Sequence, residues 1–153
     1  ALLFDQEMGR LFVVREAGHA PALQGIASED YAVDHLGSKV VVVMGHGSCG
    51  AVKAVMESNG KPLPGNLWAF QSAMAGLLES NQHDPNEEPK VHLGHLVEAN
   101  ARQQAQALVD RSDSVRKLGS ADKIQVVPAV YDLASGKVQF LKSVSPAAPA
   151  EHH

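Results

Sequence analysis

A histidine and a cysteine stand three residues apart in the segment 41–54, VVVMGHGSCGAVKA. His46 follows shortly after the apolar run 40–44, and Cys49, the only cysteine of the chain, lies in the glycine-rich turn that comes next. Imidazole nitrogen and thiolate sulfur are natural zinc ligands. Because open parallel sheets bind ligands beyond the carboxyl ends of their strands, this position favours a metal site. A helix that begins after Cys49 would also favour the thiolate.

Two other motifs fit this stretch less well. Gly45 and Gly50 have the spacing of a phosphate-binding P-loop, but the segment 51–52, Ala-Val, stands where that motif needs Lys and Ser or Thr. We therefore reject a P-loop. Ser48 and Gly50 fit a G-x-S-x-G nucleophile elbow, but His46 occupies the position of the first glycine.

The candidate ligands also have plain structural interpretations. Cys49 could be a small buried apolar residue, and His46 a hydrogen-bonded loop residue. His92 and His95 are three residues apart on an expected helix, where they could form a metal pair or a solvated helix start. His83 falls in a polar loop. Spacing alone therefore leaves the choice between metal site and structure open.

Apolar strands that alternate with helices must position these residues. The pattern predicts an α/β fold with a mainly parallel sheet flanked by helices and a C-terminal β-hairpin. Ser28 is a candidate N-cap and Gly37 a candidate C′ residue of the first helix. We expect strands at 10–18 and 39–46 and a hairpin over 124–142, and helices at 28–37, 50–58, 67–80 and 92–112, followed by a short helix and a turn over 114–123.

Composition bounds the class of protein. The 153 residues are 44% hydrophobic and 20% charged, which suits one domain with its own core. A net charge of −4 without a basic stripe argues against nucleic acid as a partner, and no apolar run is long enough to span a membrane. A single cysteine and the lack of a basic, signal-like start favour the cytoplasm.

The expected domain covers residues 1–143, and the Ala/Pro-rich residues 144–153 are expected to be a disordered tail. The last two residues, His152 and His153, could belong to an expression tag and are given no function. The missing initiator Met suggests a processed, truncated or partly recorded chain.

Five segments together resemble the bacterial β-class carbonic anhydrases, in the order in which that family has them. The chain's LFVVREAGH resembles FVVRNAGN, SEDYAVDHLGSK resembles SLEYAV…LG, and VVVVMGHGSCGAVKA resembles the zinc segment GHSDCGAVKA. LVEANARQQ resembles the EANV helix, and VVPAVYDLASGKVQFL resembles the closing hairpin YDLATGKV. Five ordered matches are more specific than any one motif.

The resemblance implies a zinc enzyme that hydrates carbon dioxide reversibly to bicarbonate and a proton. Its metal ligands here would be His46 and Cys49, and zinc lowers the pKa of a bound water to about 7. Gln6 matches a glutamine that hydrogen-bonds near the zinc, often across a dimer interface; it could equally be a turn residue. The resemblance further implies a homodimer or homotetramer, with carbon dioxide and bicarbonate as the small-molecule partners.

The sequence departs from the family pattern in ways that keep a second function open. The family's third zinc ligand is a cysteine in a Cys-x-Asp-x-Arg segment just upstream of FDQ, and this chain opens at ALLFDQ, so we expect a domain that is incomplete at its N-terminus. A catalytically inactive relative that serves as a binding or structural module is therefore the alternative. Hydrolysis of carbonyl sulfide or carbon disulfide on the same scaffold is a third hypothesis.

Two asparagines of the family's RNAGN motif are also replaced, by Glu16 and His19. Glu16 could be a surface substitution. His19 could be a replacement zinc ligand, although a loop histidine is the simpler interpretation.

Overall fold

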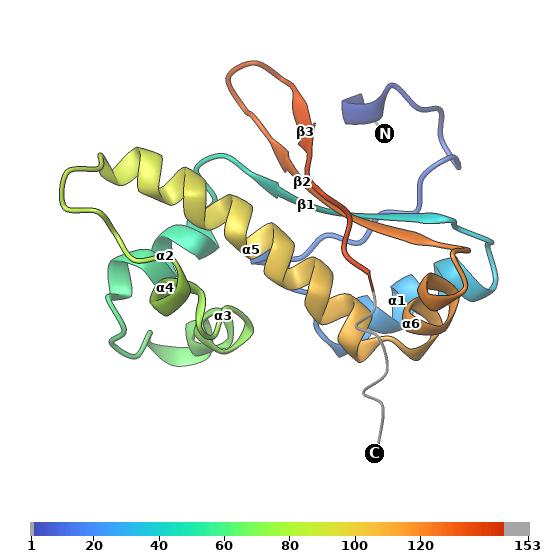
Figure 1. The fold of residues 1–153 in the computed structure, drawn as a ribbon, viewed down its shortest axis with the longest axis horizontal. Coiled ribbons are helices and arrows are strands. Elements are labelled where there is room, and N and C mark those ends of the chain that lie inside the picture. The colour runs from blue at the N-terminus through green and yellow to red at the C-terminus, as the bar shows by residue number, and fades with distance from the viewer. Residues whose placement is uncertain (1, 146–153) are drawn as a thin grey trace.

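A three-stranded mixed sheet and one long helix organise the computed structural model, which describes residues 2–145 (Figure 1). Strands β1 (Val40–His46) and β2 (Gln125–Tyr131) are parallel, and β3 (Val138–Phe140) is antiparallel to β2. The helix α5 (Pro89–Arg111) packs against both β1 and β2. This pairing confirms the predicted α/β fold with parallel strands and a C-terminal hairpin.

Shorter helices gather at the two ends of α5 (Figure 1). One buried apolar cluster joins α5 to the elements near its start, and another joins it to the elements near its end. In the described part of the chain, no helix has the length and apolar character needed to cross a membrane. The remaining elements are α1 (Leu23–Asp34), α2 (Gly50–Ser58), α3 (Trp68–Ala73), α4 (Leu77–Ser80) and α6 (Asp113–Ser120), with 3-10 turns η1 (Leu2–Phe4), η2 (Ala17–His19) and η3 (Gly65–Leu67).

The elements around the His-Cys motif form where the sequence predicts them. β1 covers the apolar run that ends at His46, and α2 begins directly after Cys49. Asn59 ends α2 in the left-handed conformation, with φ of 47°, as the Asn-Gly pair at 59–60 predicts. The predicted hairpin turns at the Ser-Gly pair 135–136, where Gly136 has φ of 70°.

The predicted strand at 10–18 is wrong. Residues 11–16 form neither helix nor strand, and Leu11, Phe12 and Val13 are 38%, 48% and 60% exposed. A strand needs a neighbour for its backbone N–H and C=O groups, and within residues 2–145 the sheet holds only β1, β2 and β3. The apolar residues that suggested a strand therefore lie in an extended surface segment.

The first helix begins earlier than predicted. The predicted N-cap, Ser28, lies inside α1, and its hydroxyl donates to the Gln24 carbonyl one turn back. Ala22 is the N-cap instead, without a side-chain hydrogen bond. The helix ends at Asp34, and Gly37 takes a left-handed φ of 70° shortly after it, so only the end of the helix was placed well.

The predicted helix over 67–80 is two short helices. α3 and α4 are separated by residues 74–76, where Gly76 has a φ of 77° that a right-handed helix does not allow. The apolar periodicity continues across the break because Met74 and Leu77 are both 2% exposed. The apolar periodicity therefore predicts correctly which side chains are buried, but it does not predict the break in the helical backbone.

The boundary of the expected C-terminal tail falls within the sheet. The Val144 backbone N–H donates to the Val126 carbonyl at 2.9 Å, which fastens this residue to β2. The rest of the expected tail from residue 146, including His152 and His153, lies outside the described residues.

A buried amide on α5 holds the turn η2 in place. The Asn100 side chain is fully buried, and its Nδ2 donates to the Gly18 carbonyl at 3.0 Å and lies 2.9 Å from Nε2 of His19. Its Oδ1 accepts from Nε2 of Gln104, which also donates to the Ala73 carbonyl. One network therefore ties α5 to η2 and to the end of α3.

The turn η2 rests on the last part of β1. A Cβ atom at Gly45 would lie 3.0 Å from Cε1 of His19 and 3.0 Å from Cγ1 of Val97 on α5. Both contacts are tighter than ordinary van der Waals distances, so the absence of a side chain at Gly45 lets the imidazole pack directly on the strand.

Replacing Asn100 by alanine should destabilise the fold by about 1–3 kcal/mol, because the Gly18 carbonyl and the His19 ring lose a buried donor. The free energy of unfolding by urea measures this loss. Gln106→Ala on the same helix is the matched control, since the Gln106 amide donates to Asp110 at the surface. Equal unfolding free energies for the two variants would show that the Asn100 network does not hold η2.

Candidate metal centre

His46 is the last residue of β1 and stands in register with Tyr131 of β2. Its side chain is exposed, and Nδ1 lies 2.9 Å from the Gly47 carbonyl oxygen. Because a carbonyl only accepts, Nδ1 carries the proton in the neutral form of the ring, which leaves the lone pair on Nε2. A histidine held in this way by a backbone carbonyl has the tautomer and the fixed ring that metal ligands typically have.

The turn between β1 and α2 brings Cys49 to the start of the helix. The Gly47 N–H donates to the Tyr131 carbonyl at 2.9 Å, which joins the turn to the end of β2. Ser48 follows in the left-handed region, with φ of 57°. Cys49 is then the N-cap of α2; it is 2% exposed and makes no side-chain capping hydrogen bond. Among the described residues its thiol forms no disulfide, and the start of a helix favours negative charge.

These two residues are of the types that bind zinc, but two ligands are fewer than a zinc site needs. A structural or catalytic zinc site holds at least three protein ligands, drawn from Cys, His and acidic residues. Within residues 2–145, no group of three or more His, Cys, Asp or Glu side chains is arranged to hold a metal ion. His46 and Cys49 therefore provide two donors, and the described part of the chain brings no third one to them.

His19, the alternative third ligand, has its Nε2 engaged elsewhere. Nε2 lies 2.9 Å from the Asn100 amide nitrogen, which can only donate, so Nε2 accepts. Burial, and secondarily the charge of His46, lower the pKa of His19 to about 4. The ring is therefore neutral at pH 7, and its interaction with Asn100 supports the interpretation of His19 as a loop histidine.

Within the described residues, Gln6 makes no hydrogen bond to His46 or Cys49. The residue is exposed, and its Nε2 donates to the Phe4 carbonyl at 2.9 Å and to the Asp5 carbonyl at 3.3 Å. These local hydrogen bonds agree with a turn residue within one chain. A role for Gln6 across a dimer interface stays a prediction.

Glu16 is more than a surface substitution. Its side chain is half-buried, and Oε2 accepts from the Ala22 N–H at 2.8 Å, at the start of α1. Its carbonyl accepts from the His19 N–H at 3.1 Å, which closes η2. Glu16 therefore connects the turn that carries His19 to the first helix.

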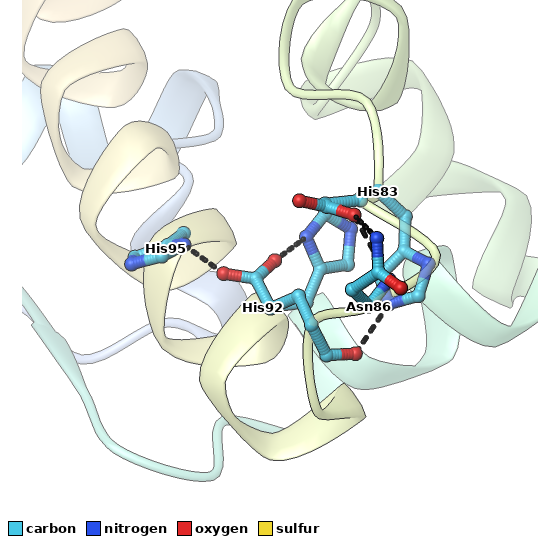
Figure 2. A network of polar contacts seen from close by, with 6 residues as sticks. His83, Asn86, His92 and His95 are labelled. Carbon is cyan, nitrogen blue, oxygen red and sulfur yellow. Dashed lines mark hydrogen bonds and ion pairs between the residues drawn. The ribbon is translucent and has the colours of Figure 1, made fainter.

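A second polar cluster lies at the start of α5, and sequence analysis missed its centre (Figure 2). The Glu87 carboxylate accepts from Nδ1 of His92 at 3.2 Å and from Nδ1 of His95 at 2.8 Å. His92 is only 6% exposed, so the expectation of a solvated helix start holds for His95 alone. Nε2 of His83 donates to the Glu87 carbonyl at 3.1 Å, and the His83 and His92 rings meet edge to face. The five-residue spacing of Glu87 and His92 gave no helical or strand signal for this contact.

A pocket of about 420 Å³ adjoins this cluster and is separate from the candidate ligands. It lies between the end of α2, α4 and the start of α5, and neither His46 nor Cys49 lines it. Its wall combines imidazoles, amides and apolar side chains, from Met56, Asn59, Leu78, Asn81, Gln82, His83, Pro89 and His92.

Known proteins resemble this chain over nearly all of its length. The family model described as carbonic anhydrase matches residues 1–138. Carbonic anhydrase 2 of Mycobacterium tuberculosis is 30% identical over 139 residues, which are 89% of this chain and 65% of that protein. A carbonic anhydrase of Mycolicibacterium smegmatis is 31% identical, covering 91% of this chain and 66% of that one. The chain therefore spans just under two thirds of these relatives.

Solved structures agree with the sequence relatives. A Coccomyxa β-carbonic anhydrase in complex with acetazolamide superposes with a TM-score of 0.79 at 26% identity, covering 94% of this chain and 67% of that one. The β-carbonic anhydrase CafA of Aspergillus fumigatus gives 0.80 at 26% identity, covering 98% and 71%. With the family match over residues 1–138, these likenesses show that the chain belongs to the carbonic anhydrase family, in its β class.

Proposed function

We propose that this chain supplies His46 and Cys49 to a zinc site that hydrates carbon dioxide reversibly to bicarbonate and a proton. The observation that carries the proposal is the turn after β1: it presents a histidine whose Nδ1 is held by the Gly47 carbonyl and a cysteine that forms no disulfide within the described residues, three residues apart. Membership of the carbonic anhydrase family supports the choice of reaction. The proposal concerns the complete protein, since the chain spans only part of its relatives.

Zinc, when bound, would supply a Lewis acid that activates water for attack on carbon dioxide. The chain's own residues orient the two proposed ligands. The Gly47 carbonyl holds the His46 ring in the required tautomer, and the hydrogen bond from the Gly47 N–H to Tyr131 fixes the turn on the sheet. The start of α2 stabilises negative charge at Cys49, and burial of the thiol keeps competing water away from the sulfur.

A third ligand and an oligomer belong to the same proposal. The two donors need at least one further ligand, and a cysteine of a Cys-x-Asp-x-Arg segment is the one that the resemblance implies. A Sordaria macrospora β-carbonic anhydrase described as tetrameric shares the fold, with a TM-score of 0.82 at 19% identity. We infer a homodimer or homotetramer, in which Gln6 could reach the site of a neighbouring copy, and a location in the cytoplasm.

The alternative proposal is an inactive relative that keeps the fold as a binding or structural module. The observation that favours it is the count of donors, since residues 2–145 contain no ready group of three. Zinc content separates the two proposals directly, because an inactive relative with two donors does not retain the ion.

The complete protein, once purified, should contain about one zinc per chain, measured by elemental analysis after dialysis against a zinc-free buffer. His46→Ala and Cys49→Ser should each reduce this content to near zero, since either leaves one donor of this chain. His19→Asn is the matched control and should keep its zinc, because the interaction of His19 with Asn100 occupies its Nε2. Zinc near zero in the unchanged, metal-replete protein would favour the inactive relative instead.

Carbon dioxide hydration should accompany the zinc. Stopped-flow measurement with a pH indicator should give a rate at least about a hundredfold above that of Cys49→Ser, since loss of metal removes the activated water. Carbonyl sulfide and carbon disulfide serve as competing substrates in the same assay. Faster turnover of either would assign the site to hydrolysis of that compound, and equal rates for the unchanged chain and Cys49→Ser would refute catalysis.

A further inference from the structure

Glu29 carries a carboxylate oxygen that has no partner. It lies on α1, and its Oε2 is buried without a hydrogen-bond partner in the described part of the chain. Leaving such an atom charged and unpaired is costly, whereas a protonated carboxyl removes the charge. The position therefore favours a carboxyl that keeps its proton.

Glu16 approaches the same helix face from the segment before η2. Its Oε1 lies 2.5 Å from where a Cβ atom on Gly25 would stand, so the carboxylate rests directly on the backbone of α1. Its Oε2 accepts from the Ala22 N–H. Gly25 and Glu29 are four residues apart on the helix, so they share one face, and Glu29 lies one turn beyond the point where Glu16 contacts α1.

Two neighbouring carboxylates add to the effect of burial on Glu29. Burial is the largest cause that raises its pKa, followed by the charges of Glu16 and Asp30, and together they bring it to about 7. Arg111 at the end of α5 donates through Nη1 to the Pro21 carbonyl, just before α1. Ser112 at the end of α5 donates to Asp30.

We propose that Glu29 and Glu16 form a proton-dependent brace between α1 and η2. With its proton in place, Glu29 is neutral and lets the Glu16 carboxylate stay on Gly25 and Ala22. When Glu29 loses the proton, two carboxylates face each other beside a buried oxygen that nothing neutralises, and the hold of Glu16 on α1 weakens.

The brace acts on the turn that contacts β1. Glu16 closes η2 through its carbonyl, and η2 lays His19 on Gly45, the residue before His46. Weaker contact of Glu16 with α1 therefore also weakens the packing of η2 on the end of β1. This inference uses only contacts within the chain and does not depend on zinc or on the proposed reaction.

Both acids of the brace depart from the motifs that the chain otherwise resembles. Glu16 stands where RNAGN has Asn, and Glu29 stands where SLEYAV has Leu. An amide and an apolar side chain cannot repel each other by charge. The two departures lie on the same face of α1, so the brace is a feature of this chain and not of the motif.

The sign of the pH effect follows from the raised pKa. In the closed brace Glu29 releases its proton near pH 7, and in the open state near its usual value of 4.5. The open state therefore binds fewer protons between these values, and opening becomes easier as the pH rises from about 4.5 to 7. Above pH 7 both states have lost the proton, and the effect levels off.

Amide hydrogen exchange over residues 17–26 tests the brace, after correction for the intrinsic pH dependence of exchange. Between pH 5 and 7, loss of the Glu29 proton should increase opening severalfold per pH unit, and above pH 7 this contribution should level off. Glu29→Gln, which is neutral at every pH, should remove this dependence and give severalfold slower exchange at pH 7. Glu79→Gln, at an exposed position on α4, is the matched control and should behave as the unchanged chain.

The same pH dependence of exchange over residues 17–26 in Glu29→Gln as in the unchanged chain would overturn the brace. The comparison of the two proteins isolates Glu29, because His19, whose lowered pKa acts in the opposite direction over the same pH range, is present in both. If Glu29→Gln does not fold, carbon-13 NMR titration of the Glu29 carboxyl in the unchanged chain decides. A midpoint near 7 supports the brace, and one near 4.5 refutes it.

Discussion

The parallel pairing of β1 and β2 is the constraint on which the rest of the structure depends. Register places His46 beside Tyr131, so the carboxyl ends of the two strands lie together. The turn that follows β1 is hydrogen-bonded to the Tyr131 carbonyl, and α5 packs across both strands. Without this pairing, neither the His46 ring nor the start of α2 would have a fixed position. The candidate metal centre is thus a property of two strands and one turn rather than of a three-residue spacing.

Local patterns predicted the elements whose signals are complete within a few residues. The apolar run before His46, the Asn-Gly stop of α2 and the Ser-Gly turn of the hairpin each contain their own physical cause. The segment 11–14 has a strand-like composition, but a strand also needs a neighbour, which no local pattern can guarantee. The prediction of one continuous helix over 67–80 failed for a related reason. Burial of Met74 and Leu77 preserves the apolar periodicity, although the backbone leaves the helical conformation at Gly76.

In the candidate site, too, local motifs could be predicted from the sequence and long-range contacts could not. His46 and Cys49 belong to one motif, and the structure places them on one turn. Asn100 lies more than 80 residues from Gly18 and His19, and Glu87 contacts its histidines across a loop-to-helix junction. Such contacts are set by tertiary packing, which spacing does not encode. The family motifs were informative here chiefly where the chain departs from them, since Glu16 has become a structural contact.

The register of β1 with β2 has a consequence for how the chain acquires its fold. All of α2 to α6 lies between the two strands in sequence, so β1 leaves the ribosome long before its partner exists. Parallel pairing over such a separation carries a large loop-closure cost and is intrinsically slow. α5, by contrast, makes its backbone hydrogen bonds locally and can form early. Assembly should therefore begin on α5, with the strands joining last, and the apolar face of β1 is the surface that a chaperone would have to shield in the meantime.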